Sequence, residues 1–178
     1  MKYVRRFMSW LASRLLVVTL ILALAVTVFY YAMNMANIQV VLKDGMAARV
    51  KIQMGMTDGQ ELDKFFVTDL IAYDERQLSP YYDGYNVRGI DHRLDMGYAW
   101  LWPWSDQVTL EVSERVPGID GRAKESRAEA LVAVGGAEAL NPPAWKASRY
   151  RVTLRLVQVG DSKYWKITDL TRIGDLDD

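Results

Sequence analysis

The longest uninterrupted apolar stretch of the chain runs from Leu15 to Met33, 19 residues without a charged side chain. At about 1.5 Å of rise per residue, a helix over this stretch reaches roughly 28 Å, close to the hydrocarbon thickness of about 30 Å in a bilayer. Tyr30 and Tyr31 at one end and Trp10 near the other fit the aromatic belts of membrane proteins. The pattern therefore predicts one transmembrane helix.

A retained signal anchor over residues 15–36 is favoured over two alternatives. A cleaved signal peptide has a shorter apolar region, of about 7 to 15 residues, and the small-residue pattern near Ala36 is a poor cleavage site. A buried helix that is apolar all round is rare in a domain of this size. Residues 1–14 carry four basic and no acidic side chains, so the positive-inside rule predicts a cytoplasmic tail and an extracytoplasmic domain over residues 37–178. We thus expect a single-pass protein of the cell membrane.

Two helical patterns follow the apolar stretch. From Ile38 to Met56 apolar residues recur at spacings of three and four, which predicts a helix continuing from the membrane, with a strand over Arg49–Met54 as the alternative. Thr57-Asp58-Gly59 then breaks the pattern. A second amphipathic helix is expected over Gly59–Tyr73.

The rest of the chain is predicted to be mainly strands, because apolar and polar residues alternate. A turn at Gly160-Asp161-Ser162 makes the last two strands a hairpin. Residues 117–145 are expected to form a solvent-exposed insertion, helical over Ala123–Val134. The expected strands are Tyr85–Arg93, Gln107–Val116, Tyr150–Val159 and Tyr164–Leu170.

Composition excludes several classes of function. The chain has no cysteine and one histidine, which leaves no thiolate metal site and no histidine cluster, so neither a metal nor a cofactor is expected. Its 22 basic and 22 acidic residues cancel, and the part after residue 14 holds 18 basic against 22 acidic residues. Nucleic acid is therefore disfavoured as a partner.

The order of helices and strands resembles a known superfamily. The segments that carry the resemblance are Lys64–Asp69, a strand over Tyr150–Leu156, and Tyr164–Leu170 with its Trp-Lys-Ile sequence after a Gly-Asp turn. Together they resemble the nuclear transport factor 2-like (cystatin-like) superfamily. The resemblance implies an α+β domain in which a curved antiparallel sheet wraps around helices as a cone.

With a basic tail and one transmembrane helix, the chain is also similar to membrane-anchored members of that superfamily, the assembly-factor subunits of type IV secretion and conjugation machines. This similarity implies a non-catalytic interaction module of an envelope complex. Its expected partners are the lipid bilayer, other membrane or envelope proteins, and a second copy of the chain.

Small isomerases and dehydratases of the superfamily suggest an alternative, a ligand-binding or catalytic cone. Side chains of suitable type are present, but no spacing singles them out, and no catalytic residue is assigned. Asp69 stands on an otherwise apolar helix face, where a buried carboxylate needs partners. His92 is interpreted as a surface or strand-end residue that the adjacent Asp91 does not hold, because neighbours on a strand point to opposite faces. The pocket candidates are Asp69, Tyr73, Tyr85 and His92.

Two further groups are candidates for interaction. Trp100, Trp102 and Trp104 would share one face of a strand, and inward packing is favoured over an outward patch for a partner or for the membrane interface. Arg149, Arg151 and Arg155 form a basic row, which suggests an anchored binder of cell-wall or nucleic-acid polymers. A solvated strand face paired with acids such as Glu111 is the favoured interpretation.

Overall fold

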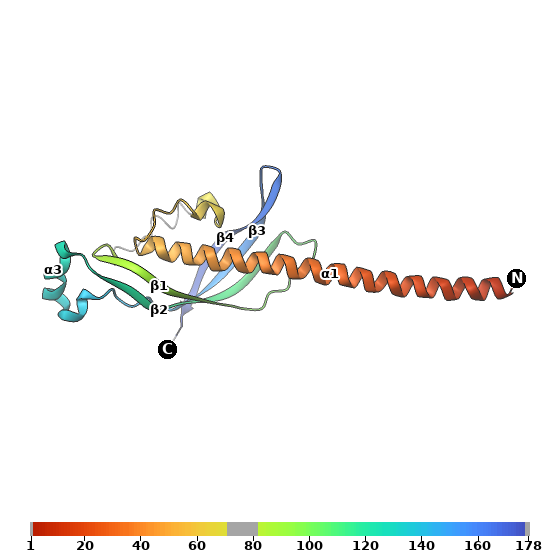
Figure 1. Ribbon diagram of the computed structural model, residues 1–178, viewed down its shortest axis with the longest axis horizontal. Coiled ribbons are helices and arrows are strands. Elements are labelled where there is room, and N and C mark those ends of the chain that lie inside the picture. Colours follow the sequence, from red (N-terminus) through yellow and green to blue (C-terminus); the bar gives the residue numbers. More distant parts are fainter. Residues whose placement is uncertain (1, 71–81, 177–178) are drawn as a thin grey trace.

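The computed structural model describes residues 2–70 and 82–176 as one long helix and a four-stranded sheet (Figure 1). The fold is α+β, as predicted, and the sheet is open and antiparallel with the order β1-β2-β3-β4. The helices are α1 (Lys2–Gln53), η1 (Leu62–Lys64), α3 (Glu125–Gly135) and η3 (Ala137–Leu140), and the strands are β1 (Tyr85–Met96), β2 (Gln107–Ala123), β3 (Ser148–Val159) and β4 (Ser162–Asp175).

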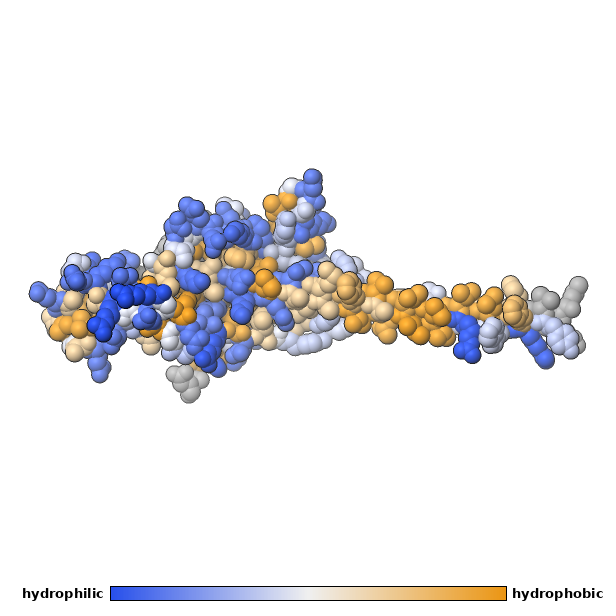
Figure 2. Space-filling view, viewed as in Figure 1, coloured by the Kyte–Doolittle hydropathy of each residue, from blue (hydrophilic) through white to orange (hydrophobic). Residues whose placement is uncertain are grey.

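Helix α1 is continuous over 52 residues, which includes both the apolar stretch and the helix expected from Ile38 onward. It contains no proline, and in the apolar half the Thr27 hydroxyl donates to the Ala23 carbonyl oxygen 2.8 Å away, so this polar group is satisfied within the helix. One apolar 18-residue window of this helix is long enough to cross a membrane, and none of it is buried in the domain. Figure 2 shows apolar surface along the visible side of the part of α1 that projects from the domain.

The second half of α1 packs along one face of the sheet. Its contact residues Tyr31, Met35, Ile38 and Leu42 are spaced by four, three and four, which places them on one side of a helix. Ile38 and Leu42 are 0% exposed. On the sheet side, the contacts come from alternate residues along β2, β3 and β4. These residues are Val108, Leu110, Val112, Val152, Leu154 and Ile167.

Strand β2 links two parts of the sheet because it is longer than its neighbours. Its residues Gln107–Glu114 pair with β3, whereas residues 112–123 pair with β1. The β1–β2 register shifts between Asp91 and Arg93, so His92 lies at a β-bulge. Pro117 of β2 lies close to this irregularity, where the missing backbone donor is tolerated.

Two predictions differ from the structure. Over residues 59–67 the expected helix Gly59–Tyr73 is wrong: η1 is a single 3₁₀ turn, and Phe66 then forms a parallel bridge with Ile167 at the edge of β4. Residues 68–70, the rest of its described part, are helical. The expected insertion begins later than residue 117, because β2 continues to Ala123. The sheet is open and α1 packs against one face of it, and the cone stays a prediction.

Candidate functional site

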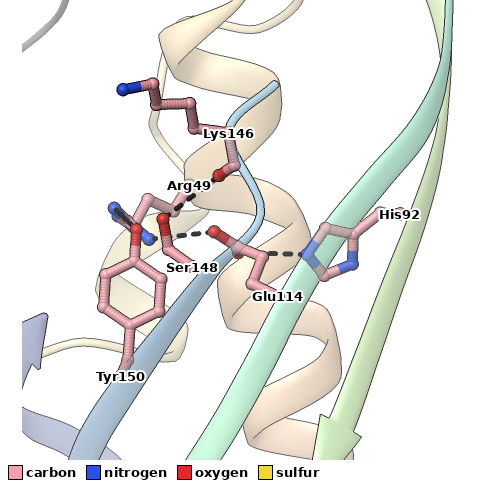
Figure 3. A network of polar contacts seen from close by, with 6 residues as sticks. All are labelled: Arg49, His92, Glu114, Lys146, Ser148 and Tyr150. Carbon is pink, nitrogen blue, oxygen red and sulfur yellow. Dashed lines mark hydrogen bonds and ion pairs between the residues drawn. The ribbon is translucent and has the colours of Figure 1, made fainter. Parts of the chain in front are cut away.

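A cluster of polar side chains lies buried between α1 and the sheet (Figure 3). Arg49 comes from α1, His92 from β1, Glu114 from β2 and Tyr150 from β3. Glu114 is 0% exposed, and the side chains of His92 and Arg49 are 7% and 9% exposed. One residue from each of four elements therefore meets in an interior that excludes most water. We call these four residues the polar clamp.

Glu114 is the centre of the polar clamp. Its Oε1 lies 3.1 Å from Nε2 of His92, and its Oε2 lies 3.6 Å from Nη1 of Arg49. When Glu114 is ionised its carboxylate only accepts hydrogen bonds, and Nε2 of the imidazole is then the donor in the first contact. The Arg49 guanidinium also donates through Nη2 to the Tyr150 hydroxyl at 3.4 Å and lies over the Tyr150 ring, 5.0 Å from its centroid.

The geometry of the clamp favours a positioning role over catalysis. A carboxylate that orients an imidazole is a common general-base arrangement, but the base must also reach a substrate proton. Here the Glu114 side chain is 0% exposed and the His92 side chain 7% exposed, which leaves little surface for a substrate to reach. A buried carboxylate is costly without a partner, and the Arg49 charge and the His92 donor compensate it. The clamp therefore ties α1 to the sheet in one register.

The three pocket candidates that the structure describes do not come together. Asp69 is exposed, and Tyr73 lies outside the described residues. Tyr85 donates its hydroxyl hydrogen to the Ala139 carbonyl oxygen at 3.1 Å, beside η3. The interpretation of His92 as a surface or strand-end residue is wrong, since it is mid-strand and bound to Glu114. Asp91 does not hold it, as expected, and instead pairs with Arg93 at 2.7 Å.

The tryptophans are exposed, and the favoured inward orientation is wrong. Trp100, Trp102 and Trp104 are 56%, 49% and 76% exposed. They belong to the connection between β1 and β2 and not to a strand, so the alternation argument does not apply. The Trp102 ring meets Trp100 edge-on at 5.5 Å and stacks on Trp104 at 5.2 Å.

The basic row lies on the outer face of β3. Arg151 pairs with Glu111 at 3.3 Å, with both side chains about half exposed, as the favoured interpretation predicted. Arg155 donates through Nε to the side-chain oxygen of Gln107 at 2.9 Å. Arg149 is exposed. Strand β2 thus provides partners for two of the three guanidinium groups, which weakens the case for a polymer-binding groove.

Sequence reasoning missed Arg49 and Glu114. The alternation that placed Val108, Leu110 and Val112 inward also places Glu114 inward, two residues further along β2. Arg49 follows Leu42 by seven residues on the contact face of α1, so the helical spacing indicates its direction. Two opposite charges on two buried faces were therefore a readable signal, although only the fold shows that they meet.

Comparisons with known proteins add no family to this description. Neither a family model, nor a curated protein, nor a solved structure matches the chain.

Proposed function

We propose that this chain is a single-pass, membrane-anchored interaction module without catalytic activity, whose domain is held rigidly on its own transmembrane helix. One observation carries the proposal: α1 runs without a break from the exposed apolar stretch into the core of the domain. A flexible linker would let the domain sample many orientations, whereas a continuous helix transmits the orientation of the membrane span to the sheet.

Contacts made by the end of the apolar stretch support an anchor that is retained. The Tyr31 hydroxyl donates to the Ala99 carbonyl oxygen at 3.2 Å, and Asn34 accepts a hydrogen bond from Nε1 of Trp165 at 3.1 Å. Cleavage near Ala36 would remove both partners from the folded domain. Residues that a signal peptidase would discard are thus part of the structure that the domain needs.

The opposite end of the span supports a cytoplasmic N-terminus. Four basic residues and no acid precede the apolar stretch, as the positive-inside rule requires. Arg14 lies over the Trp10 ring, 5.6 Å from its centroid. This arrangement suits the headgroup region of a bilayer, where the aromatic ring can contact lipid while the cation contacts water. The domain then lies outside the cell membrane.

The function follows from confinement and orientation. Molecules anchored in one membrane meet at a high effective concentration, so modest contacts are enough for assembly. The outer face of the sheet is polar and exposed, with Thr109, Glu111 and Arg151 on it, as is typical of the rim of a reversible interface. This role agrees with the resemblance to assembly-factor subunits of secretion and conjugation machines, and the expected partners are envelope proteins or a second copy.

Site-specific crosslinking in intact cells tests the proposal. A photo-crosslinking residue at exposed Thr109 should give discrete adducts with a membrane or envelope protein, or with a second copy of the chain. The matched control places the same residue at Val152, which is 0% exposed in the neighbouring strand and should give no intermolecular adduct. Adduct-free protein at Thr109 and at further outer-face positions, or recovery of the chain as a soluble cleaved form, would contradict the proposal.

A further inference from the structure

The connection between β1 and β2 exposes a run of large aromatic side chains. Residues 96–105 contain no charged side chain and hold three of the six tryptophans of the chain. Tyr98 is 81% exposed and Trp104 is 76% exposed. Aromatic surface of this size in contact with water is unfavourable, so it calls for an occupant. We call residues 96–105 the aromatic loop.

The aromatic loop lies beside α1 at the level where the apolar stretch ends. The Tyr31 ring and the Trp100 ring are 5.3 Å apart, and the Tyr31 hydroxyl bonds to the backbone of Ala99. Tyr31 is two residues from Met33, the last residue of the stretch. Figure 1 shows this β1–β2 connection next to α1 where the helix leaves the sheet.

The loop is held in place by two buried residues. Ala99 and Leu101 are 6% and 3% exposed and belong to the main core, so the backbone between the tryptophans is fixed while their rings project outward. The rings then follow one another from Trp100 to Trp102 to Trp104, with the last two nearly parallel at 12°. The loop thus presents a preformed aromatic surface that need not become ordered upon binding.

We propose that the aromatic loop is a second membrane contact, which inserts into the outer interface of the same bilayer that α1 crosses. The inference rests on the proposed transmembrane placement of α1. If Leu15–Met33 occupies the hydrocarbon region, Tyr31 lies at its outer boundary and Trp100, in contact with Tyr31, lies at the same depth. Tryptophan is the residue that best suits this layer, because its ring is apolar and its Nε1–H is polar.

A lipid surface fits the loop better than a protein partner does. The loop is continuous with the membrane span through Tyr31, and its charge-free segment is bounded by Asp95 and Asp106, which would remain on the aqueous side. A single helix crossing leaves rotation and tilt open, whereas a second contact fixes which side of the domain faces the membrane. The loop therefore sets the orientation in which the outer sheet face is offered to partners.

Depth-dependent fluorescence quenching tests this proposal on the full chain reconstituted in phosphatidylcholine vesicles. The chain has no cysteine, so one introduced cysteine gives one labelled site. An environment-sensitive fluorophore at Tyr98→Cys should show blue-shifted emission and lose most of its intensity to a quencher at a shallow acyl position. The same fluorophore at Val134→Cys on α3, which is 92% exposed and lies at the far end of the domain, should stay unquenched.

A third labelled site separates the two hypotheses. The fluorophore at Val26→Cys, in the middle of the apolar stretch, should be quenched by a deep quencher, and failure there would contradict the membrane span itself. Quenching at Val26 without any at Tyr98 would overturn the loop contact alone and would leave a protein partner as its occupant. Replacing Trp102 and Trp104 by serine should reduce quenching at Tyr98 and leave quenching at Val26 unchanged. Unchanged quenching at both sites would assign the effect to proximity alone and would overturn the role of the rings.

Discussion

The two halves of α1 are one helix with two kinds of surface. Leu22 in the first half is 60% exposed, and Leu42, twenty residues further along, is 0% exposed. Within the first half, residues 15–33 are apolar on all sides, which suits a helix surrounded by the hydrocarbon of a bilayer. The second half is apolar on one side only, with Lys43, Asp44 and Lys51 on the exposed side, which suits a sheet on one side and water on the other.

One continuous helix can suit both a bilayer and a folded domain, because its backbone hydrogen bonds are made within the helix in either case. Only the distribution of apolar side chains changes, from the whole circumference to one stripe. The transition occurs around Tyr31 and Asn34, where side chains first bond to the domain. The same substitution should therefore affect the stability of the domain in the second half and not in the first.

The largest effect is expected at the polar clamp. Glu114→Ala leaves the Arg49 charge buried without its carboxylate, so we expect the free energy of unfolding to fall by about 3–5 kcal/mol. Urea unfolding of the full chain in detergent micelles, followed by circular dichroism, measures this change.

The double variant Arg49→Met/Glu114→Leu is the control. Removing both charges leaves no isolated buried ion, so its loss should be smaller than that of either Arg49→Met or Glu114→Leu alone. A double variant whose loss equals the sum of the single losses would show that the two charges are not coupled.

Paired leucine substitutions test the two halves of α1 directly. Leu42→Ala opens a cavity against the sheet and should reduce domain stability by about 2–5 kcal/mol. Leu22→Ala makes no cavity in the domain and should leave the unfolding midpoint in urea unchanged. Equal losses from the two substitutions in the same micelles would contradict the division of α1 into a lipid half and a packed half.

At Gly45 the backbone of α1 packs closely against Phe65 and Ile167. A Cβ atom at this position would lie 2.9 Å from Cβ of Phe65 and 3.3 Å from Cδ1 of Ile167. Gly45→Ala should therefore cost about 1–3 kcal/mol through overpacking, despite the better helix propensity of alanine. Gly174→Ala, where nothing lies within 4 Å, is the matched control and should have little effect. Thermal unfolding of the two variants compares them, and a stabilised Gly45→Ala would mean that the helix moves freely over the sheet.

The smallest effect on stability is expected at Tyr82, which packs near the C-terminal end of α1. Tyr82 packs near Val50 and Met54, and burial raises the pKa of its hydroxyl above the ordinary value. The folded state then holds the proton more tightly than the unfolded state, so this contribution is present below about pH 10 and is lost as the pH rises through the folded pKa. Tyr82→Phe should flatten the alkaline fall in stability and cost about 1 kcal/mol at neutral pH, because the hydrogen bond to the Pro143 carbonyl oxygen is lost. Unfolding midpoints of both proteins from pH 7 to 11 measure this. If stability falls equally steeply with pH in Tyr82→Phe and in the unsubstituted chain, Tyr82 is not responsible for the fall.

The sequence determined the elements whose signal is local. Nineteen uncharged residues indicate a membrane-length helix whatever follows, because the backbone must satisfy itself within the segment. Alternation placed Val108, Leu110 and Val112 on one buried face, and all four strands were predicted, although each extends beyond its predicted range.

The tertiary structure decided what lies between those elements. Gly59–Tyr73 has a helical pattern, yet Phe66 joins the edge of β4, since a bridge to Ile167 outweighs a weak local preference. The tryptophans point outward because Pro103 and the turn at Ser105 keep their segment out of the sheet. Outside a strand, residues two apart need not point to the same side. Arg49 and Glu114 lie 65 positions apart in the sequence, and only the packing of α1 against the sheet brings opposite charges together where neither is stable alone.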